Sequence, residues 1–124
     1  MRKYEFTVST TPRYLADQSA PDEDQYVFAY TVTIRNTGEV AGQLITRHWI
    51  ITDGDGQVSE VRGEGVVGEQ PVLQPGQSYK YTSACPLSTP VGSMKGSYQC
   101  VASDGTKFEA PIPEFVLSMP SRLH

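Results

Sequence analysis

The stretch that decides the fold is YVFAYTVTIR, residues 26–35. Large apolar side chains occupy every second position in it, which is the period of a β-strand with one buried face. These side chains are Tyr26, Phe28, Tyr30, Val32 and Ile34. The residues that follow, NTGE at 36–39, favour a turn. The stretch therefore predicts a half-buried strand that belongs to a larger sheet.

Shorter segments of the same kind lie on both sides of this strand, and turn residues separate them. They cover residues 4–9, 41–52, 57–62, 78–84, 94–102 and 107–117. No helical period is long enough to indicate a helix, and short strands at this spacing are typical of two-sheet sandwiches. Pro12, Pro111 and Pro113 predict edge positions for the first and last strands, because proline cannot donate to a neighbouring strand. The predicted fold class is all-β: an immunoglobulin or fibronectin type III-like antiparallel β-sandwich of seven or eight strands.

The sequence of residues 41–52 does not show which face of this predicted strand is buried. One face of a regular strand there carries Ile45, Arg47, Trp49 and Ile51; the other carries Leu44, Thr46, His48 and Ile50. We place Trp49 inward, since a large indole contributes most when it is buried. Arg47 then requires a bulge, a position near the sheet's rim or a partner. The predicted core includes Phe28, Tyr30, Val32, Trp49, Tyr81 and Tyr98.

Length and charge limit the classes of function. A chain of 124 residues predicts one domain, spanning residues 1–124. The net charge is −4, and the ten basic residues are scattered, so they form no stripe that could follow a phosphate backbone. The N-terminus has a polar alternating pattern, and no apolar stretch approaches membrane-spanning length. We expect a soluble, cytoplasmic protein that binds neither nucleic acid nor a membrane.

The residues that could carry catalysis or bind a metal are few. Cys85 and Cys100 are expected to be small buried thiols in a reducing compartment, and two thiols alone cannot form a structural zinc site. His48 lies in a predicted strand and His124 at the C-terminal end, neither in a nucleophile motif. No G-x-S-x-G sequence occurs. The sequence therefore predicts a protein that is not an enzyme, with no catalytic residue, no metal site and no cofactor.

A glycine motif lies in the middle of the chain, in VRGEGVVGEQP at 61–71. Gly63, Gly65 and Gly68 have the G-x-G-x-x-G spacing of dinucleotide-binding domains, where a helix follows and its amides hold a pyrophosphate. Here Pro71 and Pro75 prevent that helix. Two interpretations remain: an ordered loop that crosses from sheet to sheet, or an anion-binding concavity of backbone N–H groups.

A ligand site, if this loop forms one, is predicted at Arg62, Gly63, Gly65 and Gly68. The glycine amides would contact the ligand and Arg62 would supply a positive charge. Glu64 and Glu69 flank the motif and would repel a lone anion. We therefore expect a nucleotide or pyrophosphate to bind there together with a divalent cation, which the carboxylates and the phosphate would share.

Several blocks of the sequence resemble the ApaG family, also called CorD. The two longest are RHWIITD at 47–53 and EVRGEGVVGEQP at 60–71, and shorter matches extend over almost the whole chain. The shorter ones are L-x-P-G at 73–76, YTS at 81–83, L-x-T-P-x-G-x-M-x-G-x-Y at 87–98, and I-P-x-F at 112–115. The family commonly has a glycine at or beside the position of Cys85, which leaves that thiol without a family role.

The resemblance implies a fibronectin-like sandwich in a bacterial cytoplasmic protein associated with cobalt tolerance and magnesium efflux. Related domains in some eukaryotic F-box proteins and in a polymerase-delta-interacting protein look like protein-interaction modules. The resemblance carries over no catalytic residue. It suggests pyrophosphate or nucleotide binding at the glycine motif. We therefore expect a non-enzymatic binding module with an unidentified protein partner; the alternative is a small-molecule site at residues 63–68.

Overall fold

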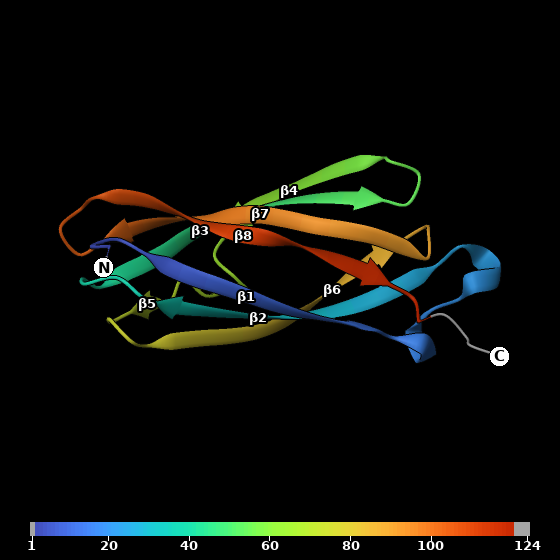
Figure 1. Ribbon diagram of the computed structural model, residues 1–124, viewed down its shortest axis with the longest axis horizontal. Coiled ribbons are helices and arrows are strands. Elements are labelled where there is room, and N and C mark those ends of the chain that lie inside the picture. Colours follow the sequence, from blue (N-terminus) through green and yellow to red (C-terminus); the bar gives the residue numbers. More distant parts are fainter. Residues whose placement is uncertain (1, 121–124) are drawn as a thin grey trace.

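The computed structural model describes residues 2–120, in which eight strands form two facing antiparallel sheets (Figure 1). The strands are β1 (Phe6–Tyr14), β2 (Tyr26–Asn36), β3 (Gly42–Asp53), β4 (Val58–Glu64), β5 (Val72–Leu73), β6 (Ser78–Leu87), β7 (Val91–Ala102) and β8 (Lys107–Ser118). One sheet has the order β1-β2-β6; the other has the order β4-β3-β7-β8, and β5 pairs with the start of β3. Two short 3-10 turns, η1 (Ala16–Gln18) and η2 (Pro21–Glu23), connect β1 to β2.

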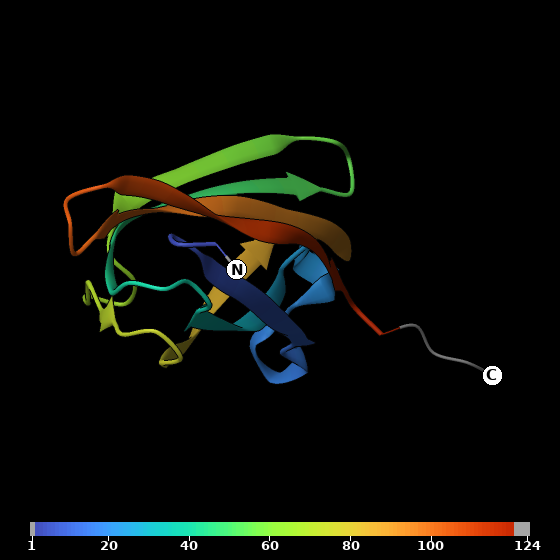
Figure 2. The same ribbon diagram turned by 60° about the vertical axis from the view of Figure 1, so that its left-hand side comes forward.

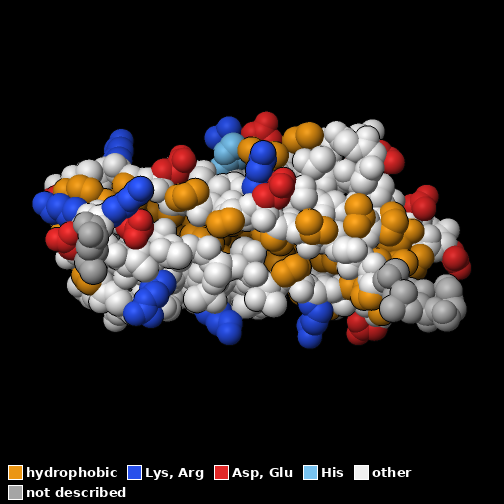
Figure 3. Space-filling view, viewed as in Figure 1, with side chains coloured by type: hydrophobic (Ala, Val, Ile, Leu, Met, Phe, Trp, Pro, Cys, Tyr) orange, Lys and Arg blue, Asp and Glu red, His pale blue; other side chains and the backbone are white. Residues whose placement is uncertain are grey.

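This architecture confirms the predicted all-β sandwich. The stretch quoted first is β2, the central strand of the three-stranded sheet, and the proline-bearing strands β1 and β8 lie at sheet edges. These two edges face each other across one flank of the sandwich, where the rings of Phe6 and Phe108 meet edge to face at 5.2 Å. Figure 3 shows hydrophobic side chains in a band along the middle of this flank. No helix in the described part of the chain is long and apolar enough to cross a membrane.

The core lies between the sheets and contains most of the residues predicted for it. Phe28, Tyr30, Val32, Trp49 and Tyr98 are all buried. The prediction for Tyr81 was only partly right, because its ring packs against the core's margin and stays half-buried. Its position on β6, at the edge of the three-stranded sheet, explains the difference, since no further strand within residues 2–120 covers that side.

A β-bulge in β3 corrects the predicted faces of that strand. The pairing of β3 with β7 shifts register between Leu44 and Thr46, so Ile45 is an extra residue. An extra residue reverses the alternation on one side of it. Leu44 therefore points into the core, fully buried, together with Trp49, although regular alternation had placed it on the opposite face. A bulge was one of the three features that could accommodate Arg47 once Trp49 was placed inward.

Asn36 is a buried hydrogen-bonding centre, whereas the sequence indicated only a turn residue. Its Nδ2 donates to the carbonyl oxygens of Val40 (2.9 Å) and Leu73 (2.8 Å), and its Oδ1 accepts from the amide of Gly38 (2.9 Å). Only 1% of the residue is exposed. Because a buried amide needs all its partners, this one side chain ties the loop after β2 to β5.

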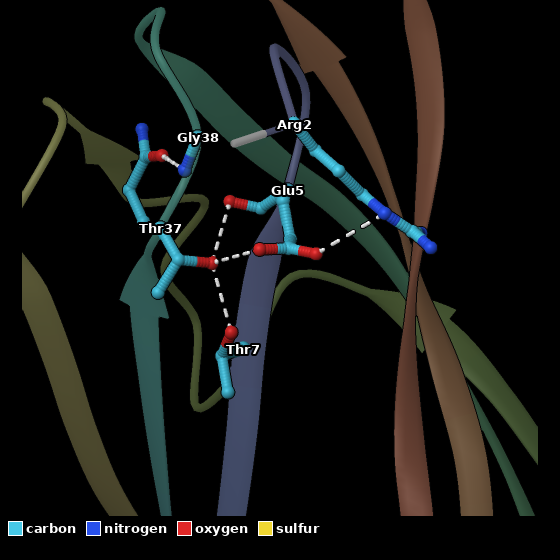
Figure 4. A network of polar contacts seen from close by, with 6 residues as sticks. Arg2, Glu5, Thr7, Thr37 and Gly38 are labelled. Atoms are coloured by element: carbon cyan, nitrogen blue, oxygen red, sulfur yellow. Dashed lines mark hydrogen bonds and ion pairs between the residues drawn. The ribbon is translucent and has the colours of Figure 1, made fainter.

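The same loop holds the chain that leads into β1, as Figure 4 shows. Thr37 Oγ1 lies 2.8 Å from Glu5 Oε1 and 2.8 Å from Thr7 Oγ1. Gly38 allows this approach, since a Cβ there would lie 2.6 Å from the carbonyl oxygen of Lys3. The N-terminal strand is thus fixed to the sheet by polar contacts as well as by its apolar face.

Cys85 and Cys100 are free, buried thiols, as predicted, and they lie on different sheets. Burial raises the pKa of Cys85 to about 11 and that of Cys100 to about 12. We expect both to react with iodoacetamide at pH 8 at least ~100-fold more slowly in the folded protein than in urea, because the thiolate is the nucleophile. Mass spectrometry of alkylated protein over time measures this. Labelling at equal rates in both conditions would contradict the burial of the thiols.

Candidate functional site

The predicted ligand residues lie at the end of β4 and in the turn that follows it. After this turn the chain forms β5, which still pairs with β3, and beyond Leu73 it crosses to β6 in the three-stranded sheet, on the left of Figure 2. The loop interpretation predicted such a crossing but placed it in the glycine motif itself. The carbonyl oxygen of Ile45, the extra residue of the β3 bulge, accepts from the Gly65 amide (2.8 Å) and from Gln70 Nε2 (3.0 Å). The bulge therefore positions the glycine motif.

Arg62 projects from the outer face of β4, away from the core. It lies opposite His48 in the β3–β4 pairing. Glu60 stands between them on the same face: its Oε1 is 2.7 Å from His48 Nε2 and 3.6 Å from Arg62 Nη2. Figure 3 shows the histidine with acidic and basic side chains around it at the top of the view. With 72% of its side chain exposed, Arg62 remains accessible to a ligand or partner.

Gly63 faces the side of β4 opposite to Arg62, where it leaves room for the guanidinium of Arg47. A Cβ at this position would lie 2.8 Å from the Cζ and both terminal nitrogens of Arg47. The same guanidinium donates through Nη1 to the carbonyl oxygens of Glu64 (2.9 Å) and Gly65 (3.0 Å). Arg47 thus has the hydrogen-bonding partners that its place on the same face as Trp49 required. Gly63 is needed because a side chain there would displace it.

Tyrosine hydroxyls lie near Arg47 at this margin of the core. The hydroxyls of Tyr81 and Tyr98 bond to each other across the two sheets. Burial raises the pKa of Tyr81 to about 12, and it raises the pKa of Tyr98 as well. Both phenols therefore stay neutral at physiological pH, where they hold the sheets together and cannot act as bases.

Gly65 and Gly68 shape a tight turn at residues 66–69. Val66 and Glu69 exchange both backbone hydrogen bonds, at 2.7 and 2.9 Å, around two central residues with positive φ. This is a type I′ turn. A Cβ on Gly65 (φ +62°) would overlap the carbonyl oxygen of Glu69, whereas a Cβ on Gly68 (φ +79°) would meet nothing. Gly65 is therefore required because a side chain would not fit, whereas Gly68 is favoured only because of its positive φ.

The other central residue of this turn is Val67, which sequence analysis did not single out. Its φ is +49°, a conformation that β-branched residues rarely adopt. Its side chain is 65% exposed, whereas its neighbour Val66 is fully buried and anchors the turn in the core. The fold would be better served by asparagine or glycine at this position. No sequence pattern reports a positive φ at a valine.

The predicted site residues are thus close in the chain but do not form one cradle. Arg62 and Gly63 point to opposite faces of β4, and the Gly65 amide is already bonded to β3. A hollow of about 340 Å³ lies nearby. It is lined by Thr46, Arg47, Arg62, Gly63, Glu64 and Gln99. Among residues 2–120, no three His, Cys, Asp or Glu side chains are grouped so that they could hold a metal ion. His124 lies outside the described residues.

Comparison with known proteins places these features in one family. The model of the ApaG domain matches residues 16–102. Protein ApaG of Ralstonia nicotianae is 61% identical over 124 residues, covering all of both chains. Protein ApaG of Nitrosospira multiformis is 62% identical over 123 residues, which are 99% of this chain and 97% of that one.

Solved structures agree with the fold. The crystal structure of a Bordetella pertussis protein named ApaA superposes with a TM-score of 0.95 at 59% identity, covering 98% of each chain. A second X-ray structure, of structural-genomics target SoR45, gives a TM-score of 0.90 at 48% identity and covers 97% of this chain and 91% of that one. The sandwich described above is therefore the fold of these relatives too.

Proposed function

Because this chain belongs to the ApaG domain family, we propose that it is a non-enzymatic binding module that acts in the bacterial cytoplasm through contact with another protein. Its physiological setting is cobalt tolerance and magnesium efflux, the processes that the family resemblance implies. A module of this kind needs a firmly held surface feature that a partner can recognise, and it needs no acid, base or nucleophile.

The observation that carries this proposal is the turn at residues 66–69. It presents the exposed, apolar Val67 at its tip, and Val66 and the Gly65–Ile45 hydrogen bond hold it in place. A non-glycine residue with positive φ costs roughly 1–3 kcal/mol, and such strain tends to be found at functional sites. A rigid, apolar projection loses little entropy on binding, which favours recognition by a protein surface. Val72, 55% exposed, lies shortly after the turn, in β5.

Replacing Val67 by asparagine is expected to raise the free energy of unfolding by about 1 kcal/mol, because asparagine tolerates positive φ and the exposed valine loses little buried area. Urea titration followed by circular dichroism measures the change. A loss of stability in Val67→Asn would mean that the valine side chain packs against the domain and is not available to a partner.

The same variant tests the function. Wild-type protein immobilised in a bacterial lysate is expected to retain a specific protein that Val67→Asn releases. Val116→Asn serves as the matched control, since Val116 is 60% exposed on the distant edge strand β8. In a strain that lacks the gene, Val67→Asn should fail to restore cobalt tolerance, whereas Val116→Asn should restore it. Equal retention and equal rescue by both variants would argue against the Val67 turn as the contact.

A second candidate is the binding of a nucleotide or pyrophosphate with a divalent cation at the glycine motif. The hollow beside β4 favours it, because Arg47, Arg62 and Glu64 line it together. Two arginines suit phosphate oxygens, and a carboxylate suits the cation. Calorimetry with ATP and pyrophosphate, each with Mg²⁺, Co²⁺ or EDTA, tests this candidate. Binding that disappears with EDTA and in Arg62→Gln would support it; the absence of heat under all conditions would exclude it.

A further inference from the structure

The strand β4 leaves one side of its backbone unpaired. It ends the order β4-β3-β7-β8, and within residues 2–120 no strand pairs with its other side. The amide of Gly65 donates to Ile45 and that of Asp53 donates to Gln57 O (3.0 Å), so the odd-numbered residues of this hairpin face β3. The backbone N–H and C=O groups of Glu60 and Arg62 therefore point to the open edge.

Of the four edge strands that are seven residues or longer, β4 alone lacks a proline. β1 contains Pro12, β6 contains Pro86, and β8 contains Pro111 and Pro113, whereas β4 has none. Proline on an edge strand prevents pairing with another chain. The fold thus blocks three of its edges and leaves the fourth able to accept a strand.

The sequence of β4 is complementary to itself when two copies run antiparallel. In a register centred on Val61, Glu60 of each copy faces Arg62 of the other, and Ser59 faces Gly63. Glu60 and Arg62 are the residues whose backbone groups point outward, so each of these two pairs can exchange backbone hydrogen bonds. Val61, 41% exposed, would be covered by its own counterpart at the two-fold axis.

Charge rejects the neighbouring registers. A register centred on Glu60 sets the two Glu60 carboxylates against each other. A register centred on Arg62 sets the two guanidinium groups together and places Glu60 against Glu64. Like charges directly opposite destabilise a strand pair, and opposite charges stabilise it. The register centred on Val61 brings opposite charges together twice. A register centred on Gly63 would also set Arg62 against Glu64 twice, but it would need the Glu64 carbonyl oxygen, which already accepts from Arg47.

From these features we infer that two copies of this chain pair through β4, antiparallel about Val61, with Glu60 of each copy facing Arg62 of the other. The two five-stranded sheets then form one continuous sheet. The pairing is confined to the centre of the strand, because the Glu64 carbonyl oxygen already accepts from Arg47. The contact is therefore small, and the dimer is weak and concentration-dependent. It does not use the Val67 turn.

Charge exchange tests the inference. Sedimentation velocity on the full chain, from about 1 μM to about 1 mM, covers the range of weak association. Wild type is expected to shift from monomer to dimer, and Glu60→Arg and Arg62→Glu should each weaken the dimer at least ~10-fold. The double variant Glu60→Arg/Arg62→Glu should recover it to within about 3-fold of wild type, because it restores both pairs in the reverse sense. An equimolar mixture of the two single variants should form a heterodimer.

The controls separate this surface from others. Lys95→Glu, on the outer face of the internal strand β7, changes the charge by two units, as Arg62→Glu does, and should leave the dimer intact. Circular dichroism checks that each variant folds. A wild type that stays monomeric up to about 1 mM would overturn the inference and leave the β4 edge to a strand of a different protein. A dimer that persists equally in both single variants would overturn it too, by placing the contact elsewhere.

Discussion

Trp49→Ala is expected to lower the free energy of unfolding by about 3–5 kcal/mol, the range for truncating a large aromatic side chain in a core. The indole is 3% exposed and lies between the two sheets. Its ring meets Tyr30 at 5.3 Å, Phe115 at 6.0 Å and Tyr98 at 6.4 Å, each nearly edge to face. Alanine would remove three aromatic contacts at once, and the rigid strands around it could close the cavity only in part.

The measurement is a urea titration followed by far-ultraviolet circular dichroism, because Trp49 is the only tryptophan and its fluorescence is lost in the variant. Val58→Ala is the control, since Val58 is 60% exposed on β4 and its truncation should change stability by less than about 0.5 kcal/mol. A loss below about 1 kcal/mol for Trp49→Ala would show that the indole contributes little to the core.

The sequence predicted this core where alternation is regular and failed where it is interrupted. β2 has no bulge, so its period of two placed Phe28, Tyr30 and Val32 correctly. In β3 the extra residue Ile45 reverses the alternation, and Leu44 was assigned to the wrong face. A bulge depends on how β3 meets β7 and the turn after β4. These partners are remote in the sequence, so local periodicity does not report them.

The candidate site was predictable in its location but not in its contacts. The sequence around Gly63, Gly65 and Gly68 correctly indicated an ordered loop without a helix, although the chain crosses between the sheets only after β5. It did not indicate that the first glycine makes room for Arg47, which lies sixteen positions earlier. The hydrogen bonds of Asn36 were hidden for the same reason, because one of their acceptors, Leu73, belongs to a different strand. Such contacts arise from topology, and a single sequence shows only their local consequences.

Gly65→Ala is expected to cost about 3–5 kcal/mol, whereas Gly68→Ala should cost only about 1–2 kcal/mol. Both residues have positive φ, so each alanine incurs the same conformational penalty. Only at Gly65 does the added Cβ overlap the carbonyl oxygen of Glu69. That oxygen accepts from the Val66 amide, and Val66 anchors the turn in the core, so moving it disrupts both the turn and its anchor.

The difference between the two variants isolates the steric role of Gly65 from its backbone conformation. Urea titrations of both proteins, with equal denaturant slopes, give this difference directly. A gap of about 2 kcal/mol or more would mean that the close approach of Glu69 is sufficient reason for the glycine, without any ligand. Equal losses would show that the turn can open at little cost. The glycine would then need another reason, and binding of a phosphate group at the freed amides would become the stronger explanation of the motif.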